Sequence, residues 1–264
     1  MKLLNINIGI KIDNTEKVAK FIQETNPDFV AIQEIVRDLE DSVYPEFKSK
    51  RGVEKVVGNL YHNIFFGPLW VTDAFRKEGK IHRDFGGLIE QGNEILSKYK
   101  ITEAANEHFY KTYAYALDWT NWKKEDHGRA LQTVEFDVNG KKLQILNIHG
   151  IWTEDKKGDE RTIDECKFVV KKAKEKNIPT IITGDFNLLP ETESIQLLNK
   201  KFRNLIDEFK ITSTRPDFND GLETGRNVVD YIFVSDEVKV NNFQVLDTNI
   251  TDHLPLLLDF EINE

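Results

Sequence analysis

The stretch LQTVEFDVNGKKLQILNIH, residues 131–149, contains two alternating apolar runs on either side of Asn139-Gly140. Alternation places apolar side chains on one face of a strand, and Asn-Gly supplies the left-handed backbone of a two-residue hairpin turn. The stretch therefore predicts a pair of antiparallel strands.

Further short apolar runs rich in β-branched residues predict strands on both sides of this hairpin. Helical periodicity at 14–25, behind Asn14 as a cap, and at 159–176 predicts helices between strands. An antiparallel hairpin with single helices between strands indicates sheets packed on each other with helices outside. The predicted strands are 3–8, 28–34, 131–138, 143–149, 180–186, 228–235 and 255–262.

Composition limits the class of protein. The chain has 264 residues, with 36 Lys and Arg against 45 Asp and Glu, a formal charge of −9. This balance argues against a protein that coats nucleic acid electrostatically, but it is compatible with a nuclease whose basic residues are local. Because no repeat or linker interrupts the chain, we expect one domain over 1–264.

The cellular location is expected to be cytoplasmic. No apolar run approaches the roughly 18 residues of a membrane-spanning helix, and Asn5 and Asn7 interrupt the apolar start. A single cysteine, Cys166, cannot form an internal disulfide, which indicates a reducing compartment. No protein partner can be inferred.

Polar side chains interrupt or end many of the predicted strands. Carboxylates and amides at the ends of buried strands cost stability unless something pairs them, so one shared site explains the pattern best. Asp, Asn and Glu oxygens suit a hard cation such as Mg²⁺, and two histidines suit proton transfer. The residues are Asn5, Asn7, Glu34, His149, Asp185, Asn187, Asp230, Asp252 and His253.

The motifs that carry these residues resemble the endonuclease/exonuclease/phosphatase superfamily, the deoxyribonuclease I-like metal-dependent phosphodiesterases. The resemblance runs from residue 3 to about 262 and implies an α+β fold. This fold is a four-layer sandwich of two mixed β-sheets packed face to face and flanked by helices. The motifs are LLNIN, FVAIQE, GNEILSKY, LNIHG, TGDFNLLPE, VVDYIFVS and TDHLPLLL.

The resemblance also implies roles for the polar residues. Glu34 would be the principal metal ligand, with Asn5, Asn7 and Asp252 close to the metal. The metal would be Mg²⁺, with Mn²⁺ as the alternative. Asp185 would orient or deprotonate the attacking water, and Asn187 would hold it or a phosphate oxygen. His253 would contact the scissile phosphate or act as a base, with Asp230 fixing its tautomer.

The resemblance leaves the roles of four residues more open. His149 matches the deoxyribonuclease, deadenylase and sphingomyelinase branches, and Glu94 matches a glutamate partner of that histidine in deoxyribonucleases. A surface carboxylate is the alternative for Glu94, and a solvent-facing strand position is the alternative for Asn5. Arg129 matches a recurrent substrate-binding arginine but could also pair with an acidic neighbour.

Four segments are expected to be loops around the site, at 67–87, 118–128, 150–161 and 213–227. They hold every tryptophan of the chain among arginines and lysines, and such aromatics can stack on bases. Each tryptophan could instead be a hydrophobic plug. The expected substrate contacts are Trp70, Trp152 and Arg215, besides Arg129.

The expected function is a metal-dependent phosphodiesterase or nuclease with a phosphodiester substrate, nucleic acid or nucleotide. One alternative is a phosphomonoesterase or a lipid phosphodiesterase of the sphingomyelinase kind with the same fold. Another is a non-catalytic binding module. All the expected core residues of the site are present, which argues against that module, because a site that no longer catalyses would be expected to have lost at least one of them. These residues are Glu34, Asp185, Asn187, Asp230 and His253.

Overall fold

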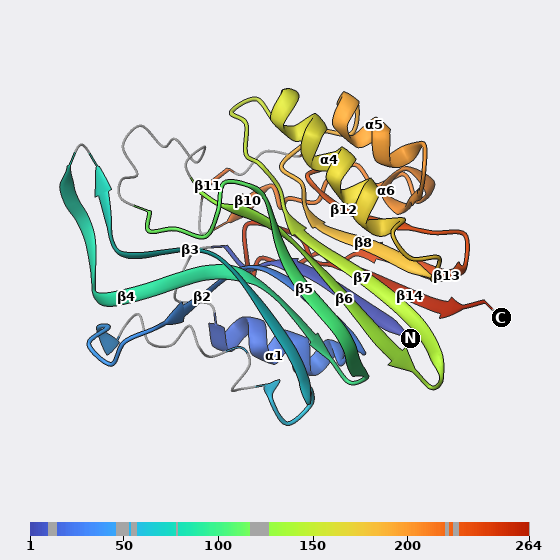
Figure 1. Cartoon of the computed structure of the whole chain (residues 1–264), viewed down its shortest axis with the longest axis horizontal. Coiled ribbons are helices and arrows are strands. Elements are labelled where there is room, and N and C mark those ends of the chain that lie inside the picture. Colours follow the sequence, from blue (N-terminus) through green and yellow to red (C-terminus); the bar gives the residue numbers. More distant parts are fainter. Residues whose placement is uncertain are drawn as a thin grey trace.

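The computed structural model describes residues 1–9, 15–45, 53, 57–77, 79–116, 127–219, 222–223 and 227–263. Two six-stranded mixed sheets dominate these residues (Figure 1). The first has the order β13-β14-β1-β2-β4-β3. Its strands are β1 (Lys2–Asn7), β2 (Phe29–Asp38), β3 (Asn63–Lys77), β4 (Lys80–Ser97), β13 (Val238–Val245) and β14 (Leu256–Ile262).

The second sheet has the order β5-β6-β7-β8-β12-β9 and holds the hairpin predicted at 131–149. Asn139 and Gly140 have φ angles of 55° and 87°, and Val138 pairs with Lys141 across the turn. The strands are β5 (Lys100–Tyr110), β6 (Arg129–Val138), β7 (Lys141–His149), β8 (Thr180–Asp185), β9 (Arg203–Asn204) and β12 (Asp230–Val234); β10 (Phe218–Asn219) pairs with β11 (Leu222–Glu223) separately.

Helices cover the outer faces of both sheets. The helix α1 (Thr15–Thr25) packs Val18, Ala19 and Ile22 against the first sheet. The helix α4 (Glu160–Ala173) begins at Asp159 with a capping box and lies over the second sheet with α5 (Glu193–Asn199) and α6 (Leu205–Glu208) (Figure 1). Asn14, the expected cap of the first helix, lies outside the described residues.

The largest hydrophobic cluster fills the space between the two sheets and extends beneath α4 and α5. Phe29 and Ile95 from the first sheet pack with Phe136 and Ile145 from the second, all fully buried. Helix, sheet, sheet and helix are therefore the four layers that the family resemblance implied, and the sandwich prediction is confirmed. Cys166 lies in this cluster, on the inner face of α4.

One expected loop is a strand pair. Residues 67–87 belong to the β3–β4 hairpin, which extends beyond the sandwich as an arm (Figure 1). Register shifts at Pro68/Trp70, Thr72/Ala74 and Phe75/Arg76 twist the pair along its length. The prediction of a loop here is wrong because each strand of the arm has the other as its partner, so backbone pairing compensates for a weak apolar pattern.

Candidate active site

Three site residues lie side by side across the second sheet. In the parallel β7–β8 pair His149 is opposite Asp185, and in the antiparallel β8–β12 pair Asp185 is opposite Asp230. Neighbouring strands lie about 5 Å apart, so this register fixes the three side chains within reach of one another. His149 Nε2 lies 3.8 Å from Asp185 Oδ2.

Gly184 makes this register possible. Its φ is +145°, and a Cβ built on it would lie 2.0 Å from the carbonyl oxygen of Ile148. Any side chain would therefore push β7 and β8 apart directly before His149 and Asp185. The glycine of the GDFN motif is required for the close approach of the two strands.

The first sheet contributes Asn7 and Glu34 across the interface between the sheets. Asn7 Nδ2 donates to Asp185 Oδ2 at 2.9 Å and to Glu34 Oε1 at 3.4 Å. Glu34 Oε1 also lies 3.6 Å from His149 Nε2. The sequence placed Glu34 at the end of its strand, but β2 continues to Asp38, and the register shifts between Ile32 and Ile35. This bulge turns the Glu34 side chain into the site.

Two site residues have a left-handed backbone conformation, which residues other than glycine rarely adopt. Glu34 has φ of +63° and Asn187 has φ of +55°. Such a conformation costs on the order of 1 kcal/mol and persists where the surroundings fix it, often at functional sites. At Asn187 the surroundings are visible: its N–H donates to Asp185 Oδ1 at 2.8 Å, and its Nδ2 donates to Gly150 O at 3.4 Å.

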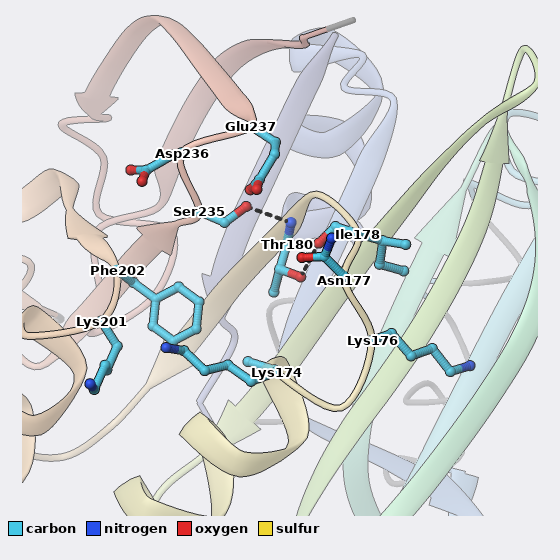
Figure 2. Close-up of a pocket in the computed structure, with 11 residues that line it drawn as sticks. Lys174, Lys176, Asn177, Ile178, Thr180, Lys201, Phe202, Ser235, Asp236 and Glu237 are labelled. Atoms are coloured by element: carbon cyan, nitrogen blue, oxygen red, sulfur yellow. Dashed lines mark hydrogen bonds between the residues drawn. The ribbon is translucent and has the colours of Figure 1, made fainter.

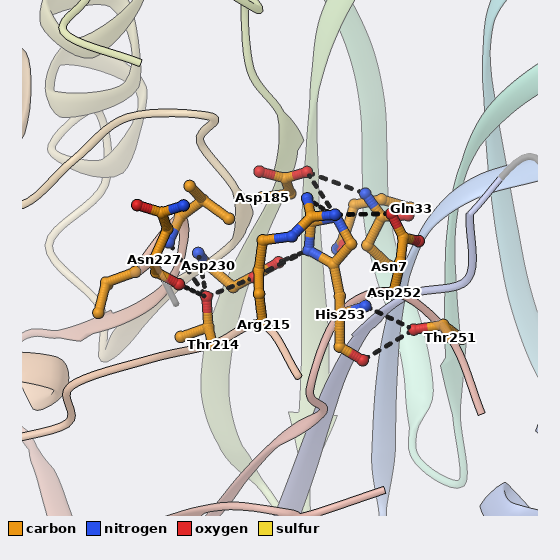
Figure 3. A network of polar contacts seen from close by, with 12 residues as sticks. Asn7, Gln33, Asp185, Thr214, Arg215, Asn227, Asp230, Thr251, Asp252 and His253 are labelled. Atoms are coloured by element: carbon orange, nitrogen blue, oxygen red, sulfur yellow. Dashed lines mark hydrogen bonds and ion pairs between the residues drawn. The ribbon is translucent and has the colours of Figure 1, made fainter. Parts of the chain in front are cut away.

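His253 is held by Asp230 from one side (Figure 3). Its Nδ1 lies 2.9 Å from Asp230 Oδ2, and Thr214 Oγ1 donates to the same oxygen at 2.7 Å. His253 Nε2 lies 3.7 Å from Asp185 Oδ2. Asp185 is thus between two imidazoles, that of His149 and that of His253.

Burial and charge act in opposite directions on these groups. Burial disfavours the charged form of His253, but Asp230 and Asp185 outweigh it and raise the pKa of His253 to about 9. Burial would raise the pKa of Asp185, yet His253, His149 and Lys156 hold that pKa below its usual value. Burial raises the pKa of Asp230. The site therefore holds an ionised Asp185 beside an imidazolium at neutral pH.

Arg215 contacts both Asp252 and His253. Its Nη2 donates to Asp252 Oδ2 at 2.8 Å, and its Nη1 lies 3.2 Å from His253 Nε2 (Figure 3). The side chain of Asp252 is 32% exposed, so this contact lies at the solvent edge of the site. Arg215, which the sequence predicted as a substrate contact, is placed beside the predicted catalytic histidine.

The donor atoms of the site fit a hard divalent cation. Asp185, Asp230 and His253 each offer one ligand atom, and these atoms lie within 4.8 Å of one another. His253 Nδ1 and Asp230 already face each other, whereas Asp185 Oδ2 and Glu34 Oε1 share the amide of Asn7. Two neighbouring carboxylate oxygens are ligands of the kind that Mg²⁺ and Mn²⁺ prefer.

Comparison with known proteins agrees with this geometry. A model of the Endonuclease/Exonuclease/phosphatase family matches residues 4–253. The chain belongs to this family. Family members are metal-dependent hydrolases of phosphoester bonds, so a hydrolase is the class of enzyme that the match supports. A search of curated proteins found no matching sequence.

Solved structures show the same family fold at low sequence identity. An endonuclease/exonuclease/phosphatase from Beutenbergia cavernae has a TM-score of 0.74 at 15% identity, covering 100% of this chain and 72% of that chain. A mannosyl-6-phosphatase from Bacteroides thetaiotaomicron has a TM-score of 0.67 at 16% identity, covering 99% and 100%. TDP2 from Caenorhabditis elegans has a TM-score of 0.66 at 18% identity, covering 98% and 74%.

The other predicted site residues of this family member occupy different surroundings. Asn5 is 1% exposed, so the solvent-facing alternative is wrong, and its Oδ1 accepts from Gln33 Nε2 at 2.9 Å. Glu94 is fully buried, so the surface alternative is wrong as well. Arg37 Nη2 binds Glu94 Oε1 at 2.5 Å, and the pairing of Glu94 with His149 stays a prediction.

The aromatic substrate contacts differ in exposure. Trp70 is 1% exposed and stacks on His127 with a centroid distance of 5.1 Å, so its indole fills the base of the arm and does not face a ligand. The prediction of a substrate contact at Trp70 is corrected accordingly. Trp152 is partly exposed in the segment after His149. Trp119, Trp122 and Arg226 lie outside the described residues.

A buried amide network beneath the site was missed by the sequence reading. Gln33 Nε2 donates to Asn5 and, at 2.7 Å, to Asn147 Oδ1, and Asn147 Nδ2 donates to Gln132 Oε1 at 2.8 Å. These amides join the two sheets where apolar packing would otherwise be expected. The sequence signal for this network is that three buried strands each carry an amide side chain at a position that faces the other sheet.

Glu165 was missed as well, although it is 1% exposed beneath the segment that follows His149. Its Oε2 accepts from the Ile151 N–H at 2.8 Å, and a Cβ on Gly150 would lie 2.6 Å from its Oε1. Burial raises the pKa of Glu165 to about 8, and Arg129 opposes the rise. Arg129 is 4% exposed. Burial lowers its pKa, and the negative charges of Glu34, Glu165 and Asp185 oppose this change, so Arg129 has an acidic environment.

Replacing Glu165 with glutamine is expected to flatten the pH dependence of stability between about pH 5 and pH 8. The folded pKa near 8 exceeds the ordinary 4.5, so the folded state retains a proton that the unfolded chain loses. The free energy of unfolding of the wild type therefore falls as pH rises through this window, by on the order of 4 kcal/mol at most. Urea unfolding at about pH 5 and at about pH 8 measures this decrease in the free energy of unfolding.

Glutamine keeps the acceptor for Ile151 but cannot ionise, so the variant should gain stability over the wild type as pH rises. Glu154→Gln, at an exposed position of the same segment, is the matched control and should parallel the wild type. Parallel curves for Glu165→Gln and the wild type would contradict the assignment.

A hollow of about 320 Å³ lies far from this chemistry (Figure 2). Its lining includes Thr180 at the beginning of β8, whereas Asp185 lies at the opposite end of the same strand. Its charged residues include Lys174, Lys201 and Glu237. The hollow therefore plays no part in the arrangement around Asp185.

Proposed function

We propose that this chain is a metal-dependent phosphodiesterase that acts on nucleic acid or a nucleotide. The observation that carries the proposal is Asp185 between two imidazoles, with Nε2 of His149 at 3.8 Å and Nε2 of His253 at 3.7 Å. A carboxylate can take a proton from water, one imidazole can stabilise negative charge, and the other can protonate a leaving oxygen.

Each residue has a separate task in this proposal. Asp185, kept ionised by its neighbours, orients and deprotonates the attacking water, and Asn187 holds the water or a phosphate oxygen. His253, as an imidazolium fixed by Asp230, stabilises the charge on the phosphoryl oxygens. His149 donates a proton to the leaving oxygen. A divalent cation bound near Glu34 and Asp185 would supply further charge neutralisation at the phosphate.

Magnesium, with manganese as the alternative, and a cytoplasmic location are parts of the same proposal. The carboxylate oxygens of Glu34 and Asp185 support Mg²⁺ or Mn²⁺ over softer metals. No helix of the described residues is long and apolar enough to cross a membrane.

A substrate panel tests the proposal. It comprises supercoiled and single-stranded DNA, RNA, cyclic dinucleotides, bis(p-nitrophenyl) phosphate and p-nitrophenyl phosphate, each with Mg²⁺ and with excess chelator. We expect hydrolysis of at least one phosphodiester that depends on the cation. Full turnover in chelator would contradict the metal requirement. Hydrolysis of phosphomonoesters alone would favour a phosphatase, the activity named for the mannosyl-6-phosphatase of similar fold.

His149→Ala is expected to lose far more activity on a natural phosphodiester than on bis(p-nitrophenyl) phosphate. A ribose hydroxyl is a poor leaving group and needs a proton, whereas p-nitrophenolate leaves without one. The measurement is the ratio of kcat/KM between the two substrates. Equal losses on both would leave His149 as a binding residue and remove the general-acid role.

A further inference from the structure

The β3–β4 hairpin leaves the sandwich as a two-stranded arm (Figure 1). β4 stops pairing with β2 where Ile89 lies opposite Asp38. From there to the turn, β3 and β4 pair only with each other among the described strands. A two-stranded ribbon is marginally stable by itself, so an arm of this kind needs support at its base.

The base of the arm has a hydrophobic cluster of its own. Phe85 and Ile89 of β4 pack there with Val36 and Val43. Phe75 of β3 meets Phe85 edge to face, with ring centroids 4.8 Å apart. The phenylalanine rings of the arm therefore stabilise the arm itself and leave contact with a partner to its exposed side chains.

The arm is attached at the edge of the sandwich that carries the site. The Val71 N–H donates to Ala114 O at 3.1 Å, and the Ala116 N–H donates to Val71 O at 2.8 Å. Ala114 and Ala116 follow β5, and β5, β6 and β7 are successive antiparallel neighbours. The end of β5 thus lies at the same edge as the end of β7, where His149 is placed.

The tip of the arm is basic, although the whole chain has a net charge of −9. Residues 76–83 contain four Lys and Arg against one Glu. Lys80 and Arg83 are exposed, and Lys80 forms no hydrogen bond or ion pair with the described residues. The register places Lys77 opposite Lys80, and like charges in opposite positions cost stability. An anionic partner at the tip would remove this cost.

The length of the arm matches about one turn of a double helix. Glu34 of the site precedes Ile35, which lies opposite Gly92, and about 12 residues of β4 separate Gly92 from Lys80. At roughly 3.3 Å per residue this contour is about 40 Å, and the bend of the arm shortens it (Figure 1). One turn of a DNA duplex is about 35 Å long.

The chemistry of the tip favours a nucleic acid over a membrane. Ile81, at 57% exposure, is the only exposed large apolar side chain among the described residues of 76–84. A membrane-binding element needs a broad apolar face, which this tip lacks. A two-stranded ribbon fits the major groove of a duplex, and Lys and Arg contacts to phosphates supply much of the affinity for duplexes.

We infer that the β3–β4 arm binds a double-stranded nucleic acid substrate, with Lys80 and Arg83 on phosphates about one helical turn from the cleaved bond. The inference rests on the proposed function for the class of substrate and narrows that class to double helices. Because the chain as a whole is acidic, the basic tip also gives an approaching polyanion a local point of attraction.

Binding without turnover tests the arm. Fluorescence anisotropy of a labelled DNA duplex of about 30 base pairs, in excess chelator, gives Kd at about 50 mM and about 200 mM salt. We expect the double variant Lys80→Gln with Arg83→Gln to bind more weakly than the wild type at the lower salt. Each phosphate contact adds about 0.9 to the slope of log affinity against log salt, so the wild type should lose about tenfold more affinity than the variant over this increase.

The matched control is Lys200→Gln with Lys201→Gln. These two lysines are exposed beside α5 and their loss changes the net charge by the same amount, so this variant should bind as the wild type does. Hydrolysis of bis(p-nitrophenyl) phosphate in Mg²⁺ should be the same in the arm variant and the wild type, because this small ester does not reach the arm.

Three results would overturn the inference. One is an arm variant with the affinity and salt dependence of the wild type, as expected if the cations only protect the strand edges from pairing with other chains. Another is an equal effect of the variant on a single strand of the same length. The third is arm-dependent binding to vesicles of phosphatidylserine and phosphatidylcholine without arm-dependent binding to the duplex. A wild type that hydrolyses no phosphodiester would count against the proposed function, while the duplex affinities would still decide on the arm.

Discussion

Replacing Asp185 with asparagine is expected to lower turnover by about a hundredfold or more while the protein remains folded. This is the usual scale for a lost acid/base group at the reacting centre. Asp185 lies at the centre of the site. It accepts a hydrogen bond from Asn7 of the first sheet, and His149 and His253 lie on either side of it. Asparagine has nearly the same shape and removes the charge and the basicity.

The fold should survive because little of the packing depends on the charge. The carbonyl oxygen of the new amide can accept from the Asn187 N–H, as Asp185 Oδ1 does now at 2.8 Å. The contact with Asn7 Nδ2 is weakened, since two amide nitrogens would face each other there. His253, His149 and Lys156 outweigh burial and lower the pKa of Asp185, so removal of its charge should also cost some stability, which the Tm reports.

The measurement is kcat on the best substrate of the panel, with far-ultraviolet circular dichroism and Tm as checks on folding. Asp164→Asn is the matched control, because that aspartate is exposed on α4 and pairs only with Lys167 among the described residues. It should retain full activity. Near-normal turnover in Asp185→Asn, on a substrate that the wild type hydrolyses in the same assay, would exclude a role for this carboxylate in proton transfer.

Much of the site could be predicted because its residues follow strands whose local patterns are strong. His149 and Asp185 end β7 and β8, and Asp230 begins β12, as the apolar runs before and after them indicate. Strand ends at one edge of a sheet lie together whatever the remaining chain does. The sequence therefore located the side chains, but the bulge that turns Glu34 inward depends on its pairing with β4 and was not visible.

Buried polar groups away from the strand ends could not be predicted in the same way. Gln33, Asn147 and Gln132 stand in apolar runs, where an amide is usually assigned to the solvent face. They are buried because each finds a partner on the opposite sheet, Gln33 with Asn147 and Gln132 with the Asn93 carbonyl, and such partners come from tertiary packing. Glu165 lies next to Cys166 on α4, and only the approach of Gly150 and Ile151 explains its burial.

His253→Ala is the second variant with a large expected effect, a loss of turnover of about a hundredfold or more. Its imidazole is placed by Asp230 at 2.9 Å and directs Nε2 towards Asp185. Alanine removes the imidazolium that would stabilise charge on the phosphoryl oxygens and leaves Asp230 buried with Thr214 as its remaining side-chain partner. Some loss of stability should accompany the loss of activity, because a buried carboxylate then lacks its cation.

His253→Gln separates the two effects, since an amide can still donate to Asp230 but carries no charge. We expect stability closer to the wild type and turnover as low as in the alanine variant. His82→Ala, on the exposed arm, is the matched control and should change neither quantity. Turnover in His253→Gln near that of the wild type would show that a hydrogen bond, and not the charge, is what the reaction needs at this position.

The pH profile gives an independent check on the charge. Asp230 and Asp185 outweigh burial and raise the pKa of His253 to about 9, so the imidazolium is present at neutral pH and is lost as pH rises through 9. Turnover that requires the imidazolium should therefore fall on the alkaline side near pH 9. Asp230→Asn removes the nearer of the two charges, which lowers the pKa of His253, and the alkaline fall should move to lower pH. An alkaline limb that stays in place in Asp230→Asn would mean that another group, and not His253, limits the reaction at high pH.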